Sequence, residues 1–126
     1  MSSTLETLQT LTNHGWVQQE TARCFEKVGK KATTSFGYDT PAGEQLDLYY
    51  YEGETSINFR IYNQKQRDSK WFGFPINDQL VGLLKTITEQ QDEIKTEDYF
   101  SFYFGIQNAC EGASILAWEQ WEDNYS

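Results

Sequence analysis

The residues best suited to metal or acid–base chemistry are carboxylates in the last third of the sequence. Glu119, Glu122 and Asp123 would share a face on a helix but not on a strand. The D-x-D-x-D-G spacing of a calcium loop does not occur. Glu97 and Asp98 are adjacent, so on a strand they would point to opposite faces and could not act on one substrate. We therefore expect no metal site and no pair of catalytic carboxylates.

The single histidine and the two cysteines do not indicate nucleophilic catalysis. His14 falls at a predicted helix end, where its side chain favours the last carbonyl groups of the helix. Cys24 and Cys110 match no metal-binding or redox spacing, so we expect two buried free thiols. The glycines form neither of the common phosphate-binding motifs. The sequence therefore predicts a protein that is not an enzyme and needs no cofactor.

Negative charge is concentrated in the later part of the chain. Residues 1–43 carry four acidic and four basic residues, whereas residues 44–126 carry 15 acidic and 6 basic ones and so hold the whole net charge of −9. Residues 92–126 alone hold 8 acidic residues and one basic residue. An acidic surface of this kind repels nucleic acid and attracts a basic protein. We therefore expect a basic protein partner and no direct binding to nucleic acid.

Hydrophobic periodicity predicts two helices and several strands. Apolar residues recur at helical spacing over about 4–14 and again over about 78–93. Extended or alternating patterns predict strands in six segments: 21–39, 46–51, 57–62, 70–74, 99–106 and 114–121. Helix is the alternative for the last of these segments, because Ala, Leu, Glu and Gln favour it.

Strands joined by short turns favour an antiparallel sheet. We therefore predict one domain over residues 1–126 in the α+β class. Its antiparallel sheet would have about six strands, with the 78–93 helix packed on one face and a short N-terminal helix. No run of about 18 apolar residues occurs, and the first residues do not have the pattern of a secretory signal. We expect a cytoplasmic protein that does not bind a membrane.

Strand alternation divides the apolar and aromatic residues between two faces of the sheet. The face under the helix would hold nine core residues: Leu46, Leu48, Ile57, Phe59, Ile61, Phe100, Phe102, Phe104 and Ile106. The opposite face would hold Arg60 together with five tyrosines: Tyr49, Tyr51, Tyr62, Tyr99 and Tyr103. Tyrosine is enriched at protein interfaces, so this face is a candidate binding surface. Packing beneath a further layer of the protein is the alternative.

A second candidate binding surface lies near the end of the sequence. Trp118 and Trp121 are interspersed with Glu119, Glu122 and Asp123. Tryptophan often anchors an interface, and the carboxylates would attract a basic partner. Together with the five tyrosines, these are the predicted partner-binding residues.

These observations predict a non-enzymatic acidic binding protein. The expected role is that of an inhibitor, immunity protein or anti-defence protein that blocks a basic, nucleic-acid-handling protein. One alternative is a small acidic dimeric chaperone or adaptor of the secretion-chaperone type, which would make the chain a homodimer. A second alternative is an enzyme whose site the sequence does not reveal.

Overall fold

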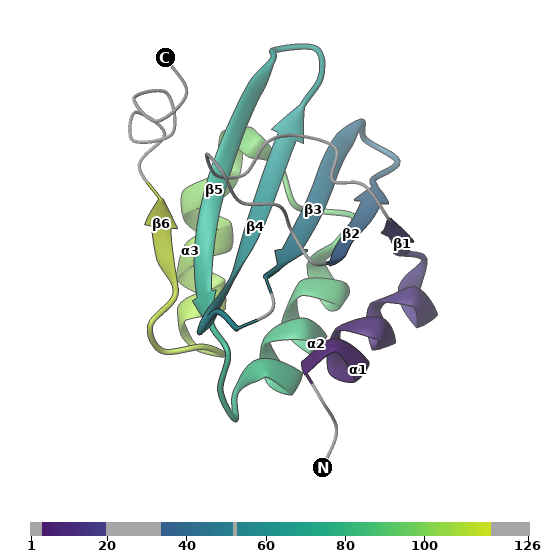
Figure 1. The fold of residues 1–126 in the computed structure, drawn as a ribbon. Coiled ribbons are helices and arrows are strands. Elements are labelled where there is room, and N and C mark those ends of the chain that lie inside the picture. The colour runs from purple at the N-terminus through teal and green to yellow at the C-terminus, as the bar shows by residue number, and fades with distance from the viewer. Residues whose placement is uncertain (1–3, 20–33, 52, 117–126) are drawn as a thin grey trace, which may run out of the picture.

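The computed structural model describes residues 4–19, 34–51 and 53–116. These residues form an antiparallel sheet of six strands that lie side by side in chain order, with the helices on one face (Figure 1). The strands are β1 (Val17–Gln19), β2 (Thr34–Asp39), β3 (Glu44–Tyr50), β4 (Ser56–Asn63), β5 (Asp68–Pro75) and β6 (Ser114–Leu116). The α+β prediction and the antiparallel sheet are therefore confirmed.

The helices occur before and after the block formed by β1 to β5. They are α1 (Thr4–Gln9), the 3-10 turn η1 (Thr10–His14), α2 (Leu80–Gln90), the 3-10 turn η2 (Thr96–Asp98) and α3 (Tyr99–Gln107). Gly15 ends the N-terminal helical segment with a φ of 92°, a conformation that glycine adopts without steric cost. Just before α2, the Asn77 side-chain oxygen accepts a hydrogen bond from the Gln79 N–H at 2.8 Å.

The hydrophobic core lies between these helices and the sheet face that they cover. Phe59 of β4 is completely buried, and its ring stacks on that of Phe102 of α3 with the centroids 5.4 Å apart. The predicted apolar stripe of α2 is buried in the same cluster: Leu80, Leu83, Leu84 and Ile87. Trp16 is also buried there, and its indole N–H donates to Gln91 Oε1 at 2.8 Å. This bond ties the N-terminal segment to the end of α2.

The predicted strand over residues 99–106 is wrong, because this segment is helix α3. Aromatic residues occupy so many of its positions that the segment also satisfies a helical spacing. Tyr99, Phe102, Tyr103 and Ile106 follow the i, i+3, i+4, i+7 pattern of one helix face. That face packs on the sheet, with Phe102 and Ile106 buried.

The opposite face of the sheet carries a second cluster of buried side chains. Asp47 and Arg60, paired across β3 and β4, form an ion pair with a distance of 2.8 Å between Oδ2 and Nη2. Nearby, the rings of Tyr49 and Trp71 stack with their centroids 5.7 Å apart. Tyr49 is fully buried, and Tyr51 is also buried in this cluster. These two tyrosines therefore do not form an exposed surface.

The Tyr38 hydroxyl links β2 to the segment after α2 by donating a hydrogen bond to Asp92. This hydrogen bond is the main reason why the pKa of Tyr38 is raised above its ordinary value of 10.0, and burial of the hydroxyl raises it further. A raised pKa gives stability that is complete below the pKa of the unfolded chain. That stability is lost as the pH rises through the pKa of the folded protein.

The Tyr38→Phe variant should therefore differ from the wild type in how its stability depends on alkaline pH. We expect the stability advantage of the wild type over the variant to be constant between about pH 7 and 9 and to shrink above about pH 10. Urea unfolding of both proteins at closely spaced pH values measures this difference. An advantage that stays constant or grows above pH 10 would contradict the assignment of the Tyr38–Asp92 bond.

No helix in the described part of the chain is both long and apolar enough to cross a membrane.

Candidate functional site

The outward side of α3 exposes aromatic rings on a helix whose other side is buried. Phe100 is 53 % exposed and Phe104 is 61 % exposed, although both were predicted to lie in the core. Their ring centroids are 6.3 Å apart, one helical turn along α3. Tyr99 and Tyr103 are half-buried and contact these rings at centroid distances of 4.3 and 5.9 Å. We call these four residues the α3 aromatic face; Tyr99 and Tyr103 lie at its border with the side of the helix that packs on the sheet.

Contacts along α3 hold this face in a fixed orientation. In the middle of the helix, Phe102 stacks on Phe59 beneath it. The Tyr103 hydroxyl donates to the carbonyl oxygen of Ala113 at 3.0 Å, and the Gln107 side-chain amide donates to the same hydroxyl at 2.9 Å. The exposed rings therefore stand on a helix that is already ordered, which reduces the entropy lost on binding a partner.

A buried carboxylate holds the segment that leads into α3. Glu44, at the start of β3, is 4 % exposed. Its Oε2 accepts hydrogen bonds from the Thr96 hydroxyl at 2.7 Å and from the Thr96 N–H at 3.2 Å. Its Oε1 accepts from the Asn63 side-chain amide at 2.7 Å. Glu44 thus connects the sheet to η2, which immediately precedes α3.

The Glu44→Ala substitution should destabilise the protein by about 1–3 kcal/mol, because it leaves the buried donors of Thr96 and the half-buried amide of Asn63 without their acceptor. Urea unfolding measures the loss. As a control, Glu89→Ala removes an exposed carboxylate and should change the stability by less than about 0.5 kcal/mol. If the two variants were equally stable, the hydrogen bonds of Glu44 would not be needed to hold η2.

Acidic side chains lie at both ends of the α3 aromatic face. Glu97 and Asp98 precede α3 and are exposed, and Glu111 is exposed shortly after the helix. Glu97 and Asp98 belong to η2, not to a strand, so the predicted separation onto opposite faces of a sheet does not apply to them. Carboxylates at this position are also favoured by the dipole of the helix that follows.

A basic side chain of the protein itself already contacts one ring of this face. The Lys70 ammonium of β5 lies 4.9 Å from the centre of the Tyr99 ring and 3.5 Å from an Asp68 carboxylate oxygen. This arrangement shows a cation held jointly by an aromatic ring and a carboxylate. The two exposed phenylalanines offer further rings of the same kind.

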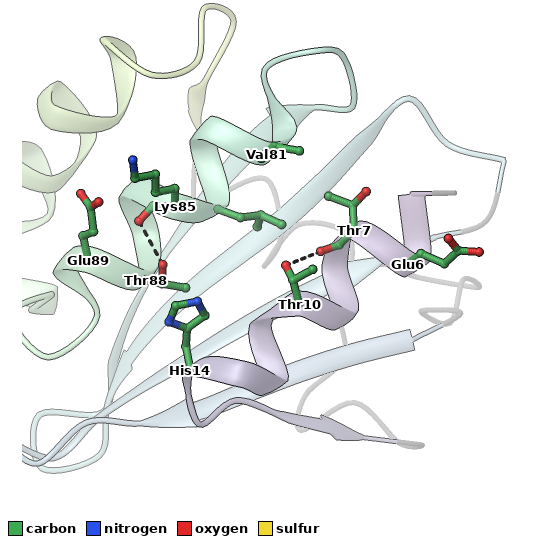
Figure 2. Close-up of a pocket in the computed structure, with 9 residues that line it drawn as sticks. Glu6, Thr7, Thr10, His14, Val81, Lys85, Thr88 and Glu89 are labelled. Carbon is green, nitrogen blue, oxygen red and sulfur yellow. Dashed lines mark hydrogen bonds between the residues drawn. The ribbon is translucent and has the colours of Figure 1, made fainter. Parts of the chain in front are cut away.

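A second candidate site is the groove between the N-terminal helical segment and α2. It has a volume of about 540 Å³ and is lined by Glu6, Thr7, Thr10, His14, Val81, Leu84, Lys85, Thr88 and Glu89. Figure 2 shows the His14 ring turned toward α2 across this groove. Val81, 68 % exposed, gives the groove an apolar side chain that solvent reaches.

The Thr10 and Thr88 hydroxyls in this groove are not arranged for nucleophilic catalysis. Thr10 Oγ1 donates to the Thr7 carbonyl at 2.6 Å, and Thr88 Oγ1 donates to the Lys85 carbonyl at 3.0 Å. Each hydroxyl proton is thus directed at the backbone of its own helix and not at His14 (Figure 2). A nucleophile needs a hydrogen bond to its general base, and these geometries do not supply one.

The described residues also provide no cluster for a metal ion. Within residues 4–19, 34–51 and 53–116, no group of three or more His, Cys, Asp or Glu side chains is placed to hold one. Cys110 is buried, and burial raises the pKa of its thiol. A raised pKa lowers the fraction of the reactive thiolate form. Cys24 lies outside the described residues.

The predicted partner-binding residues do not form one surface. Tyr49 and Tyr51 are buried, and half-buried Tyr62 lies under the guanidinium of Arg60, which is 4.8 Å from the ring centre. Tyr99 and Tyr103 belong to α3 on the other side of the sheet, so the predicted face of five tyrosines is wrong. The remaining predicted residues lie outside the described part of the chain: Trp118, Glu119, Trp121, Glu122 and Asp123.

The sequence interpretation missed Phe100 and Phe104 as exposed residues. The signal that could have identified them is the pair Glu97–Asp98 directly before the aromatic segment, since acidic residues are typical of the first turn of a helix. Once the segment is taken as a helix, Phe100 and Phe104 fall on the side away from Phe102 and Ile106.

Comparisons of this chain with protein-family models, with curated proteins and with solved structures found no match.

Proposed function

We propose that this chain is an acidic binding protein that uses the α3 aromatic face to bind and block a basic protein. The observation that carries the proposal is the pair of exposed rings, Phe100 and Phe104, on a helix flanked by carboxylates. Neighbouring apolar side chains that are exposed together often mark an interaction site, and aromatic side chains are enriched at protein interfaces.

Charge and aromatic area would make different contributions to this binding. The net charge of −9 would accelerate the encounter with a basic partner at low salt. The rings of Phe100 and Phe104 would then lose their contact with water, which slows dissociation. An inhibitor, immunity protein or anti-defence protein needs this combination of fast association and slow release.

The proposal is tested by capturing partners on immobilised protein in parallel with a Phe100→Ser/Phe104→Ser variant. A captured protein is then purified, and its association rate is measured between about 50 and 500 mM salt. We expect a basic protein whose association slows steeply with salt, because the charges of the two proteins are screened. The activity of that protein should fall when the chain is bound.

Val81→Ser is the matched control, because it removes an apolar side chain of similar exposure from α2. It should retain the partner that the double variant loses. A partner that is acidic, that associates at a rate independent of salt, or that binds the double variant as well as the wild type would contradict the proposed function.

A further inference from the structure

We infer that the α3 aromatic face receives arginine side chains of the partner, with a cavity beside it as the seat of one guanidinium group. This inference rests on the proposed function and specifies which residue type of the basic partner is recognised. It follows from three features of the described residues: the exposed rings, the adjoining cavity and the distribution of charge around both.

The cavity lies between the end of α2, η2 and the first half of α3. Its volume is about 360 Å³, and it is lined by Gln90, Glu93, Ile94, Lys95, Asp98, Ser101 and Phe102. It adjoins the α3 aromatic face because Ser101, which lines it, is exposed and lies three residues before Phe104, the spacing of neighbours on a helix surface. A partner segment lying across the two rings would therefore reach the cavity with one long side chain.

The lining of the cavity suits a side chain with an apolar stem and a cationic head. Ile94 and Phe102 are buried residues of the core whose side chains border the cavity and offer apolar contact to methylene groups. Glu93 and Asp98 are exposed carboxylates, and Gln90 adds an amide that can accept a hydrogen bond. The apolar and acidic parts of this lining match the two parts of an arginine side chain.

The charge around the cavity favours a cation even though the chain places one of its own nearby. Lys95 lines the cavity and is exposed, so its ammonium can remain in solvent. Against it stand four exposed carboxylates in the same stretch of chain: Asp92, Glu93, Glu97 and Asp98. The surplus of negative charge identifies a basic segment, and not a second copy of this acidic chain, as the occupant of this surface.

Arginine fits this surface better than lysine for a geometric reason. The guanidinium is planar, so it can stack on Phe100 or Phe104 and still donate hydrogen bonds to a carboxylate in its own plane. A lysine ammonium is more strongly hydrated and gains less from contact with a ring. The contact of Lys70 with Tyr99 is an example of a cation on one ring of this face, and the rings of Phe100 and Phe104 are exposed to solvent.

The inference is tested by NMR titration of the ¹⁵N-labelled protein with N-acetyl-argininamide. We expect saturable shifts of the backbone amides of Ile94, Ser101 and Phe104, and weaker binding of N-acetyl-lysinamide. N-acetyl-citrullinamide, which has the shape of arginine without its charge, should produce no saturable shift. Glu93→Gln and Asp98→Asn should each weaken the binding of N-acetyl-argininamide about two- to five-fold.

Asp78→Asn is the matched control, because it removes one exposed carboxylate just before α2, outside this cavity and outside the groove described above, and should leave the binding of N-acetyl-argininamide unchanged. Shifts that do not saturate, that are the same for all three probes, or that persist in both cavity variants would overturn the inference. The proposed function would stand in that case if a basic protein still bound through Phe100 and Phe104. Conversely, the absence of a basic protein partner would overturn the proposed function whatever the probes show.

Discussion

Replacing Phe59 by alanine should lower the free energy of unfolding by about 3–5 kcal/mol, a large fraction of the stability of a domain of this size. The ring of Phe59 is completely buried at the middle of the sheet. It lies between Trp16, Phe72, Phe74 and Phe102, with ring centroids 5.4–6.5 Å away. Truncation would remove these contacts and leave a cavity that the surrounding strands cannot close.

Urea unfolding of the variant and the wild type measures this loss. Val81→Ala is the control, because the Val81 side chain is mostly in solvent and its truncation should change stability by less than about 0.5 kcal/mol. The Phe59 variant should also exchange the amide hydrogens of α3 faster, since Phe102 rests on the ring that is removed. A loss below about 1 kcal/mol would show that Phe59 is not the centre of the core.

The parts of the fold that the sequence predicts correctly are those in which apolar and polar residues follow a clear period. Leu46 and Leu48 alternate with polar residues, as do Ile57, Phe59 and Ile61, and the two segments pair as β3 and β4. The apolar stripe of α2 is equally clear, although the helix begins at Leu80 and ends at Gln90, inside the predicted range of 78–93. Helix ends are harder to place because turns flank them.

The failure at α3 has a specific physical cause. In the segment Tyr99–Gln107, nearly every residue up to Ile106 is aromatic or apolar, so spacings of two and of four are both satisfied. Periodicity then cannot distinguish helix from strand. The difference is made by tertiary contacts, with Phe102 packing on Phe59 and Glu44 holding Thr96 just before the helix. Neither contact is visible in a local pattern.

The buried ion pair illustrates another limit of sequence reasoning. Arg60 was expected on the sheet face opposite the helix, with exposure and burial of that face both open, and a lone arginine in a strand gives no sign that it is buried. In the structure it donates to Asp47 directly across the neighbouring strand, at 3.1 Å from Nε to Oδ2. Recognising this pair requires the register of β3 against β4. Alternation alone does not fix this register, because a shift of two residues keeps every side chain on the same face of the sheet.

The sequence predicted the residue types of the candidate site, acidic and aromatic, but not which aromatic residues are exposed. The charge distribution drew attention to the region after residue 92, which contains α3 and its flanking carboxylates. The exposed rings of Phe100 and Phe104 were nevertheless assigned to the core, since a strand would have turned them inward together with Phe102. Because the segment was given the two-residue period of a strand and not the period of a helix, its two exposed phenylalanine rings were predicted to lie in the interior.

The Phe100→Ala/Phe104→Ala double variant should release the basic partner about 30-fold faster than the wild type, or faster still, while its folding stability stays nearly the same. Both rings are more than half exposed in the free protein, so their removal costs the fold little. In a complex, these rings would be the groups that lose most water. Interface anchors of this kind typically contribute about 2 kcal/mol or more, which corresponds to about 30-fold in affinity.

Dissociation rates from the immobilised partner and urea unfolding of the free variant provide the two measurements. The Glu97→Gln/Glu111→Gln variant is an informative comparison, because it removes neighbouring charge outside the cavity and leaves the rings in place. It should mainly slow association at low salt, whereas the phenylalanine variant should mainly accelerate release. If the phenylalanine variant released the partner at the wild-type rate, the exposed rings would not be the anchor. Binding would then have to be sought in the groove between the N-terminal helical segment and α2.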